Sequence, residues 1–584
     1  GGSLDADYFR IRDINSRGLD ISGTTTVQDL SHGDMVLAVN GGSLITVTPS
    51  VIEQGNKTFT GNTFATSANA TSGYNVYLTA QPSTSNYWRF QNHNGSFAGE
   101  DYDNDFGGNG GDPGYIRWDD SLSSIDISGT VYSNEGSTPM GSPTCDGQTE
   151  VVRAVLDGST TTYSGSCSSS TGDYLITGLS YVDTDVITVH LNNAPGDEKA
   201  VAVVADPTSS DINDLDLYQN RVIVRHEGAD PITISDMNAF DGGDDADIQF
   251  TASTGTPDTL TVDSQAELYV WPDMTFAPGG NITLQPGGSG DRWDGSLQLA
   301  ASSTFSVSGT ESHSIGGSWF ASSTANFSAD QSTIDFTATG QGKEIITQEN
   351  PFYNLTFNGL GGGWTFGSGN HYIDGDLNII AGSVPSPPGT LSAKGSWSNS
   401  GIFAHSSGTV TFTSTSTGKT IVAGASPFYI ATFDGINGSW QLSTSTLDVD
   451  NNLNITNGTL DAASQDINVA ENLTLASGGY FTKGAGTLTF DGSGTNNWTD
   501  NNTTTQDIGN VAIDGSTKTL NLGSDVRATD ITIGADDTLD VTASNYDIYC
   551  SGSWTNNNTF QARNATVTME ATTQGEIFAA SRPN

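Results

Sequence analysis

The sequence predicts an all-β protein, on the evidence of its composition, its short alternating apolar segments and its internal repeats. Only 15% of the 584 residues are charged and 34% are hydrophobic, so Ser, Thr, Asn and Gly must supply most of the polar surface. Thr and Asn are poor helix formers and Gly is worse, whereas Thr suits strands and Gly, Asn and Asp suit turns. Aromatic residues make up 9%, and a disordered chain usually contains fewer.

Residues 1–126 form the first predicted domain. They contain separated strand-like segments, including "YFRIRDI", "MVLAVNGGSLITVTPSVI" and "YNVYLTA". Such short alternating segments with irregular turns are typical of a β-sandwich or jelly-roll. A long, acidic, Gly-rich loop follows between two aromatic segments.

Residues 127–226 form the second predicted domain, in which short strands alternate with turns over about one hundred residues. This is the size of an immunoglobulin-like or prealbumin-like β-sandwich. The phrase "GDYLITGL" resembles a strand and turn of CNA-B-like and carboxypeptidase-regulatory-like modules of surface proteins. The resemblance covers one strand pair and implies a β-sandwich module.

Residues 227–584 contain about four copies of one unit, the first less complete, in which related positions recur every 76 to 81 residues. The phrase "GSW" marks three of the copies, and Leu takes the place of its Trp in another. One series of related positions is Trp319, Trp397, Leu473 and Trp554. A second series is Leu297, Leu377, Leu453 and Ile531.

Each copy holds about four alternating segments, or roughly 19 residues per turn, as expected for a parallel β-helix. Stacked turns bury each other's apolar side chains. We expect the repeated Trp residues to fill the same corner of the core in each copy; the alternative is stacking on carbohydrate. The repeats resemble the extracellular β-solenoids of filamentous-haemagglutinin-like and autotransporter-passenger proteins. This resemblance implies secretion and a structural or adhesive role.

The most site-like segment is the acidic loop "EDYDNDFGGNGGD". Its candidate ligands are Glu100, Asp101, Asp103, Asp105 and Asp112. Carboxylates on an irregular loop can direct several oxygens at one Ca²⁺, and without basic partners these acids would otherwise repel one another. The spacing departs from an EF-hand loop, because Gly107 comes one place late. The loop is a candidate calcium site, with a solvated acidic loop as the alternative, and "DGGDDAD" at 241–247 is a weaker second candidate.

The chain contains three cysteines. Cys145 and Cys167 flank one short segment and are candidates for a disulfide in an extracellular protein. Cys550 would then remain unpaired and buried as a small hydrophobic residue.

The charge balance disfavours two classes of partner. With 66 acidic and 19 basic residues the net charge is −47, which disfavours nucleic acid and anionic membrane surfaces. The sequence contains no run of 18 apolar residues, so it predicts no segment that crosses a membrane. The start "GGSLDADYF" is typical of a mature chain after removal of a signal peptide.

No motif of a known enzyme class stands out in the sequence. G-x-S-x-G, H-E-x-x-H and phosphate-binding loops are missing, and the seven His residues are scattered. A β-helix glycosidase needs only a carboxylate pair, so an enzyme remains an alternative, resting on fold analogy alone. We expect no enzymatic activity.

The sequence therefore predicts a secreted structural subunit of a prokaryotic surface appendage or extracellular filament, which assembles with copies of itself. A candidate donor strand at the N-terminus, containing Tyr8, Phe9, Ile11 and Ile14, could complete a neighbour's sheet. The alternatives are a monomeric adhesin that binds glycans, and a polysaccharide-degrading enzyme.

Overall fold

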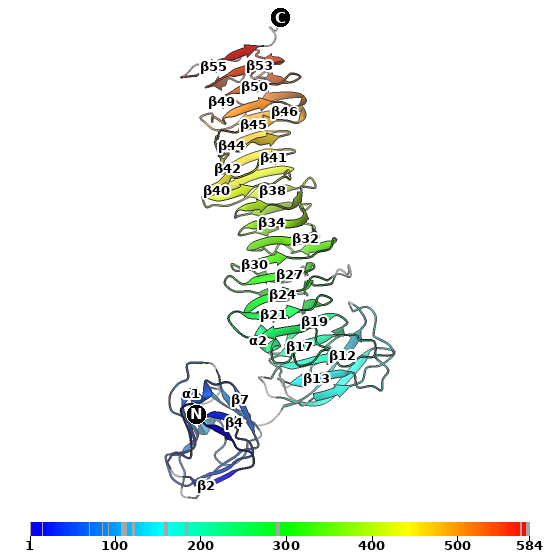
Figure 1. The fold of residues 1–584 in the computed structure, drawn as a ribbon, viewed down its shortest axis with the longest axis vertical. Coiled ribbons are helices and arrows are strands. Elements are labelled where there is room, and N and C mark those ends of the chain that lie inside the picture. The colour runs from blue at the N-terminus through cyan, green and yellow to red at the C-terminus, as the bar shows by residue number, and fades with distance from the viewer. Residues whose placement is uncertain are drawn as a thin grey trace. The chain divides into compact units, whose positions relative to one another are not determined.

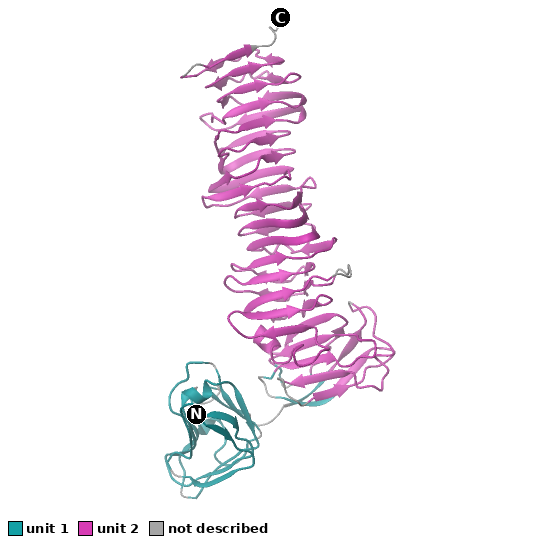
Figure 2. Ribbon diagram, in the orientation of Figure 1, with its two compact units in different colours: residues 1–127, 177–185, 207–211 teal, residues 128–176, 186–206, 212–584 magenta. Residues whose placement is uncertain are grey.

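The computed structural model divides the chain into two compact units (Figure 2). Unit 1 comprises residues 1–127, 177–185 and 207–211, and unit 2 comprises residues 128–176, 186–206 and 212–584. The structure describes residues 2–14, 16–68, 70–84, 86–91, 93–106, 114–119, 123–134, 136–156, 162–181, 185–208, 210–287, 293–572 and 575–579. Its α-helices there are the four-residue α1 (Pro49–Ile52) and α2 (Ile234–Met237). Among these residues no helix is long and apolar enough to span a membrane.

Unit 1 is built from short strands that pair in parallel. They are β1 (Ser3–Asp5), β2 (Arg10–Ile14), β3 (Leu19–Ile21), β4 (Thr26–Asp29), β5 (Asp34–Leu37), β6 (Gly42–Val47), β7 (Lys57–Thr60), β8 (Thr63–Thr66), β9 (Gly73–Leu78), β10 (Trp88–Gln91) and β11 (Ile116–Asp119). The sheets have the orders β1-β4, β2-β5-β8, β3-β6-β9 and β7-β10-β11. Every pairing within them is parallel.

The predicted N-terminal sandwich is therefore not confirmed, because sandwiches and jelly-rolls pair their strands mainly antiparallel. Residues 1–119 instead coil as a short solenoid: Met35 pairs with Phe64, which lies 29 residues further along the chain. Both side chains are fully buried, as is Phe90 beside Phe64. The alternation of buried and exposed residues is the same in parallel and antiparallel strands, so this pattern cannot distinguish the two arrangements.

Residues 128–226 form two sheets. One is β15 (Asp173–Tyr181), β12 (Ser123–Tyr132) and β18 (Leu217–Tyr218). The other begins with β14 (Thr162–Gly165), β13 (Val152–Leu156), β16 (Ile187–Leu191) and β17 (Val201–Ala205), which pair antiparallel. Next to β17 lies β19 (Arg221–His226), in parallel, and β19 pairs in turn with the first solenoid strands. The sheet thus runs across residue 226, and the predicted domain boundaries and sandwich family stay predictions.

After an antiparallel pair of β20 (Phe250–Ser253) and β21 (Asp258–Val262), the chain continues as a parallel β-solenoid, as predicted (Figure 1). A first ladder contains β22 (Glu267–Val270), β25 (Leu297–Leu299), β28 (Trp319–Ala321), β31 (Lys343–Ile346) and the end of β32 (Asn354–Phe366). A second contains β27 (Ser312–Ile315), β30 (Thr333–Phe336), the start of β32, β34 (Leu377–Pro385), β36 (Trp397–Asn399) and β39 (Lys419–Val422). A third contains β35 (Thr390–Ala393), β38 (Thr409–Phe412), β40 (Ile430–Leu442), β42 (Leu453–Asp461) and β44 (Leu473–Thr482).

The repeated residues of the sequence stack on one another inside this solenoid. Each member of the Leu series pairs with the member of the Trp series one turn later: Leu297 with Trp319, Leu377 with Trp397, Leu453 with Leu473, and Ile531 with Trp554. All eight side chains are buried in one continuous core. The repeated Trp residues are therefore core residues, which removes them as carbohydrate-stacking candidates.

The expectation that equivalent residues occupy the same corner is wrong. Trp319 lies on the first ladder, Trp397 on the second and Leu473 on the third. On the second ladder, three successive strand pairings lead from Ile334 to Trp397. The residue of the next copy that is equivalent to Ile334 is Val410, and it lies on the third ladder, two strands after Trp397 in the chain. A copy thus spans three turns and two further faces, because the turns between Trp319 and Trp397 take 19 to 26 residues and most of them are longer than 19. Successive copies are rotated by one face.

Candidate functional site

Three of the five predicted calcium ligands lie together in unit 1. One carboxylate oxygen from each of Glu100, Asp103 and Asp105 lies within 4.8 Å of the other two. Glu100 begins a single 3₁₀ turn, Glu100–Tyr102, and both aspartates are almost fully buried. Asp101 is on the same turn but is not part of this group. Asp112 lies outside the described residues.

Neighbouring strands hold the two buried aspartates in place. Trp118 Nε1 donates to Asp103 Oδ2 at 2.7 Å, and the Ile116 backbone N–H donates to Asp105 Oδ2 at 2.7 Å. Asn104, between them, pairs with β9 through Val76 O and the Leu78 N–H. Residues 103–105 are thus held between β9 and β11.

The electrostatics of this acidic cluster favour a cation. Burial, together with repulsion from Asp105 and Glu100, raises the pKa of the Asp103 carboxyl to about 8, although the Trp118 N–H opposes the shift. A bound divalent cation can replace the proton that Asp103 would otherwise keep at neutral pH. Ca²⁺ takes about six to eight oxygen ligands, so three carboxylates form part of a shell that peptide carbonyls or water would complete. The donor set fits a hard cation.

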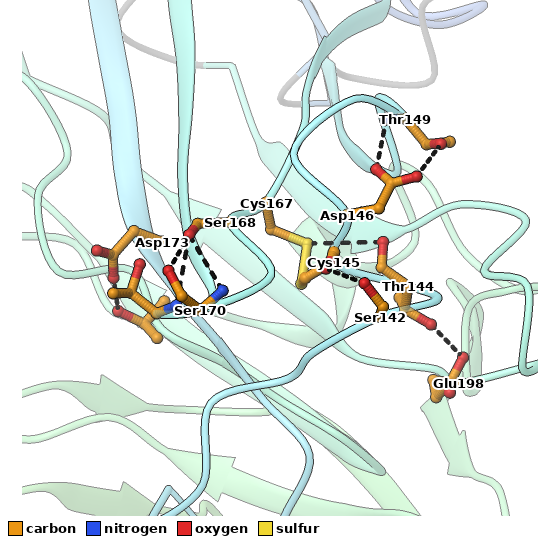
Figure 3. The surroundings of a disulfide bond; sticks show 12 residues. Ser142, Thr144, Cys145, Asp146, Thr149, Cys167, Ser168, Ser170, Asp173 and Glu198 are labelled. Atoms are coloured by element: carbon orange, nitrogen blue, oxygen red, sulfur yellow. Dashed lines mark hydrogen bonds between the residues drawn. A yellow bond between two sulfur atoms is a disulfide. The ribbon is translucent and has the colours of Figure 1, made fainter.

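Cys145 and Cys167 are joined by a disulfide (Figure 3). Both are fully buried, and the bond closes a segment of 22 residues beside the Ser168–Ser170 turn. The same corner is fixed by Thr144, whose hydroxyl donates to Glu198 at 2.8 Å. The segment between the two cysteines contains β13 and β14, so the bond limits the freedom of this strand pair in the unfolded chain.

The candidate donor strand belongs to the sheet of its own unit. Ile11 and Ile14 lie on β2, which pairs with β5, and Ile14 is part of the unit 1 core. Phe9 packs against the same core and Tyr8, largely exposed, stacks on His32 with ring centroids 4.3 Å apart. Donation of this strand to a neighbour would require β2 to leave β5.

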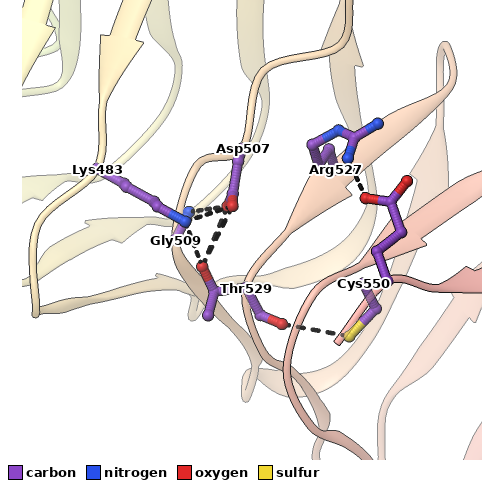
Figure 4. Close-up of polar contacts among 7 residues, drawn as sticks. Lys483, Asp507, Gly509, Arg527, Thr529 and Cys550 are labelled. Atoms are coloured by element: carbon purple, nitrogen blue, oxygen red, sulfur yellow. Dashed lines mark hydrogen bonds and ion pairs between the residues drawn. The ribbon is translucent and has the colours of Figure 1, made fainter. Parts of the chain in front are cut away.

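Cys550 is a free, buried cysteine near the last solenoid turns (Figure 4). Its thiol donates to the Thr529 carbonyl at 3.3 Å, and burial raises its pKa. Beside it, Lys483 pairs with Asp507 and donates to the Thr529 hydroxyl at 2.8 Å, so side chains of successive turns are linked. These contacts indicate a structural role for Cys550.

Comparison of the chain with protein-family models, with curated proteins and with solved structures finds no match. Function must therefore be argued from the molecule itself.

Two features were missed in the sequence. The first is a pair of exposed aliphatic side chains, Leu360 and Ile436, which are 85% and 65% exposed. They occupy equivalent places in "PFYNLTFNGL" and "PFYIATFDGI", so the repeat alignment contained the signal. The second is a pocket beside Arg221, whose lining residues come from distant segments and left no local signal.

Proposed function

We propose that the chain is a secreted structural subunit of a prokaryotic surface appendage or extracellular filament. The observation that carries this proposal is the solenoid itself, in which parallel ladders and one core continue from β19 to Trp554. Each turn is held by backbone hydrogen bonds and apolar contacts to its two neighbours, an arrangement that resists bending over its whole length. A rod of this kind suits spacing and load-bearing better than it suits a catalytic cleft.

The disulfide supports secretion, because such bonds persist mainly in oxidising compartments. The net charge of −47 opposes non-specific binding to nucleic acid, which is compatible with a location outside the cell. The cation proposed for the acidic cluster of unit 1 is Ca²⁺, which is consistent with the same location.

The exposed tips support self-association through the sides of the solenoid. Leu360 and Ile436 follow Gly359 and Gly435 in bulges of β32 and β40, and point away from the core. In the next copy the equivalent tip residue is Ser516, which is also exposed. Burying an aliphatic side chain of this size in a contact contributes about 2 kcal/mol, or more than tenfold in affinity. Two tips at repeat-related positions can therefore hold neighbouring copies together.

Strand donation by residues 8–14 stays a proposal with a defined cost. The donated strand would have to give up its pairing with β5 and the burial of Ile14. Lateral contact through the tips requires no such unfolding, so we give it preference.

Electron microscopy of the purified chain tests the proposal, using wild type, the double variant Leu360→Ser with Ile436→Ser, and the control Ser516→Ala. Ser is already present at this tip in another copy, so the double variant should fold normally, as circular dichroism would check. We expect ordered filaments or bundles for wild type and the control, and separated rods for the double variant. Separated rods for wild type would refute the filament, whereas filaments in the double variant would refute only the tip contact.

A monomeric adhesin is the second candidate function. The pocket beside Arg221 favours it, because a structural rod has no need of a pocket lined by buried charged groups.

A further inference from the structure

We propose that the pocket beside Arg221 binds one ring of a neutral saccharide. It lies within unit 2, where the loop after β12 meets the first turns of the solenoid, and encloses about 250 Å³. Pockets for drug-sized ligands are usually larger than about 300 Å³, so this one suits a single small ring. The site is distinct from the acidic cluster of unit 1 and does not depend on filament formation.

A fixed guanidinium, that of Arg221, is part of the pocket lining. Arg221 Nε donates to Glu267 Oε2 at 2.7 Å, and Arg221 Nη2 donates to Gln298 at 3.2 Å. Arg221 and Glu267 are 5% and 1% exposed, so this ion pair is shielded from water. Shielded, hydrogen-bonded charges keep their geometry, as a selective binding site requires.

Aromatic rings surround the guanidinium. Its carbon lies 4.7 Å from the Tyr218 ring centre, 4.6 Å from that of Tyr269 and 5.5 Å from that of Trp293. Trp293 is half-buried and lines the pocket, and its other neighbour is Phe320 at 5.3 Å between centroids. An indole held in this way offers an apolar surface for the C–H groups of a sugar ring, next to polar groups for its hydroxyls.

The polar lining is chemically matched to hydroxyl groups. Four amide side chains contribute to it: Asn134, Gln219, Asn220 and Gln265. An amide both donates and accepts, as a sugar hydroxyl does, whereas Glu267 and Asp294 accept only and Arg221 donates only. Asn134 is held by the turn at Ser137 and Thr138, so the other three amides are the groups that can meet the hydroxyls of a ring, as its burial requires.

The charge of the lining disfavours other ligand classes. One guanidinium and two carboxylates line the described part of the pocket, so it contains groups of both signs. An anion such as phosphate would meet both carboxylates, and a quaternary ammonium would meet the fixed Arg221. A lipid chain would bury the polar lining without hydrogen bonds. A neutral polyhydroxylated ring avoids all three penalties.

Titration of the purified full chain tests the inference, with glucose, galactose, mannose and N-acetylglucosamine as probes, followed by calorimetry and saturation-transfer NMR. We expect at least one of them to bind with a Kd of about 1 mM, as is typical of a single small ring. Trp293→Ala and Gln265→Ala should each weaken binding by about tenfold or more. Trp271→Ala is the matched control. Trp271 also packs against an arginine, Arg225, but neither residue lines the pocket.

Several outcomes would overturn the inference. One is the absence of saturable binding for all four sugars, and another is equal binding of a sugar by wild type and Trp293→Ala. Binding of tetramethylammonium or inorganic phosphate in place of the sugars would overturn it as well. Circular dichroism of each variant separates loss of binding from loss of fold. Since the assay uses single chains in solution, its failure leaves the filament proposal standing.

Discussion

Replacing Trp397 by Ala should open a cavity in one turn of the solenoid and loosen that turn alone. The Trp397 side chain is fully buried, with ring centroids 5.0 Å from Phe403 and 5.1 Å from Phe428. Truncation of a buried Trp costs about 3–5 kcal/mol. Trp397→Leu should cost less, about 1–2 kcal/mol, because Leu473 already fills the equivalent position and the indole N–H has no hydrogen-bond partner among the described residues.

Hydrogen exchange followed by mass spectrometry resolves the effect along the chain. A loss of about 4 kcal/mol corresponds to roughly a thousandfold faster exchange through local opening. We expect this acceleration for peptides from β34, β36 and β39, which form the ladder around Trp397. Peptides around Trp554 should keep wild-type rates, since each turn contacts only its neighbours. Uniform acceleration along the whole solenoid, or none beside Trp397, would refute this account of its stability.

Two further predictions concern titration and metal binding. Burial lowers the pKa of His313 to about 4, so the stability that its neutral form provides should be lost as pH falls from about 6.5 to about 4. In denaturant titrations His313→Leu should remove up to about 3 kcal/mol of this pH dependence. An unchanged dependence of the unfolding free energy on pH would contradict the prediction. Calcium should raise the melting temperature of unit 1 in calorimetry at neutral pH. That rise should shrink in Asp105→Asn but not in Asp101→Asn, and an equal response of the two variants would exclude the acidic cluster as the site.

Much of the candidate metal site followed from local sequence. Asp103 and Asp105 alternate, and the structure gathers them with Glu100. The exclusion of Asp101 depends on the 3₁₀ turn and on pairing with β9 and β11, which bring Trp118 and Ile116 to the two aspartates. Those contacts join strands far apart in the chain, so the spacing of acids could not reveal which of them share a site.

The sequence by itself determined the all-β class, the presence of a β-solenoid and the alternation that buries residues such as Leu297. These properties depend on which side chains alternate along a strand, and alternation is local. Only the tertiary structure decided that strands of residues 1–119 pair in parallel, that each copy is rotated by one face, and that Arg221 meets Trp293 in a pocket. The reason is that the partners in these parallel ladders lie 19 or more residues apart, and a change of one or two residues per turn alters every later alignment without changing the alternation.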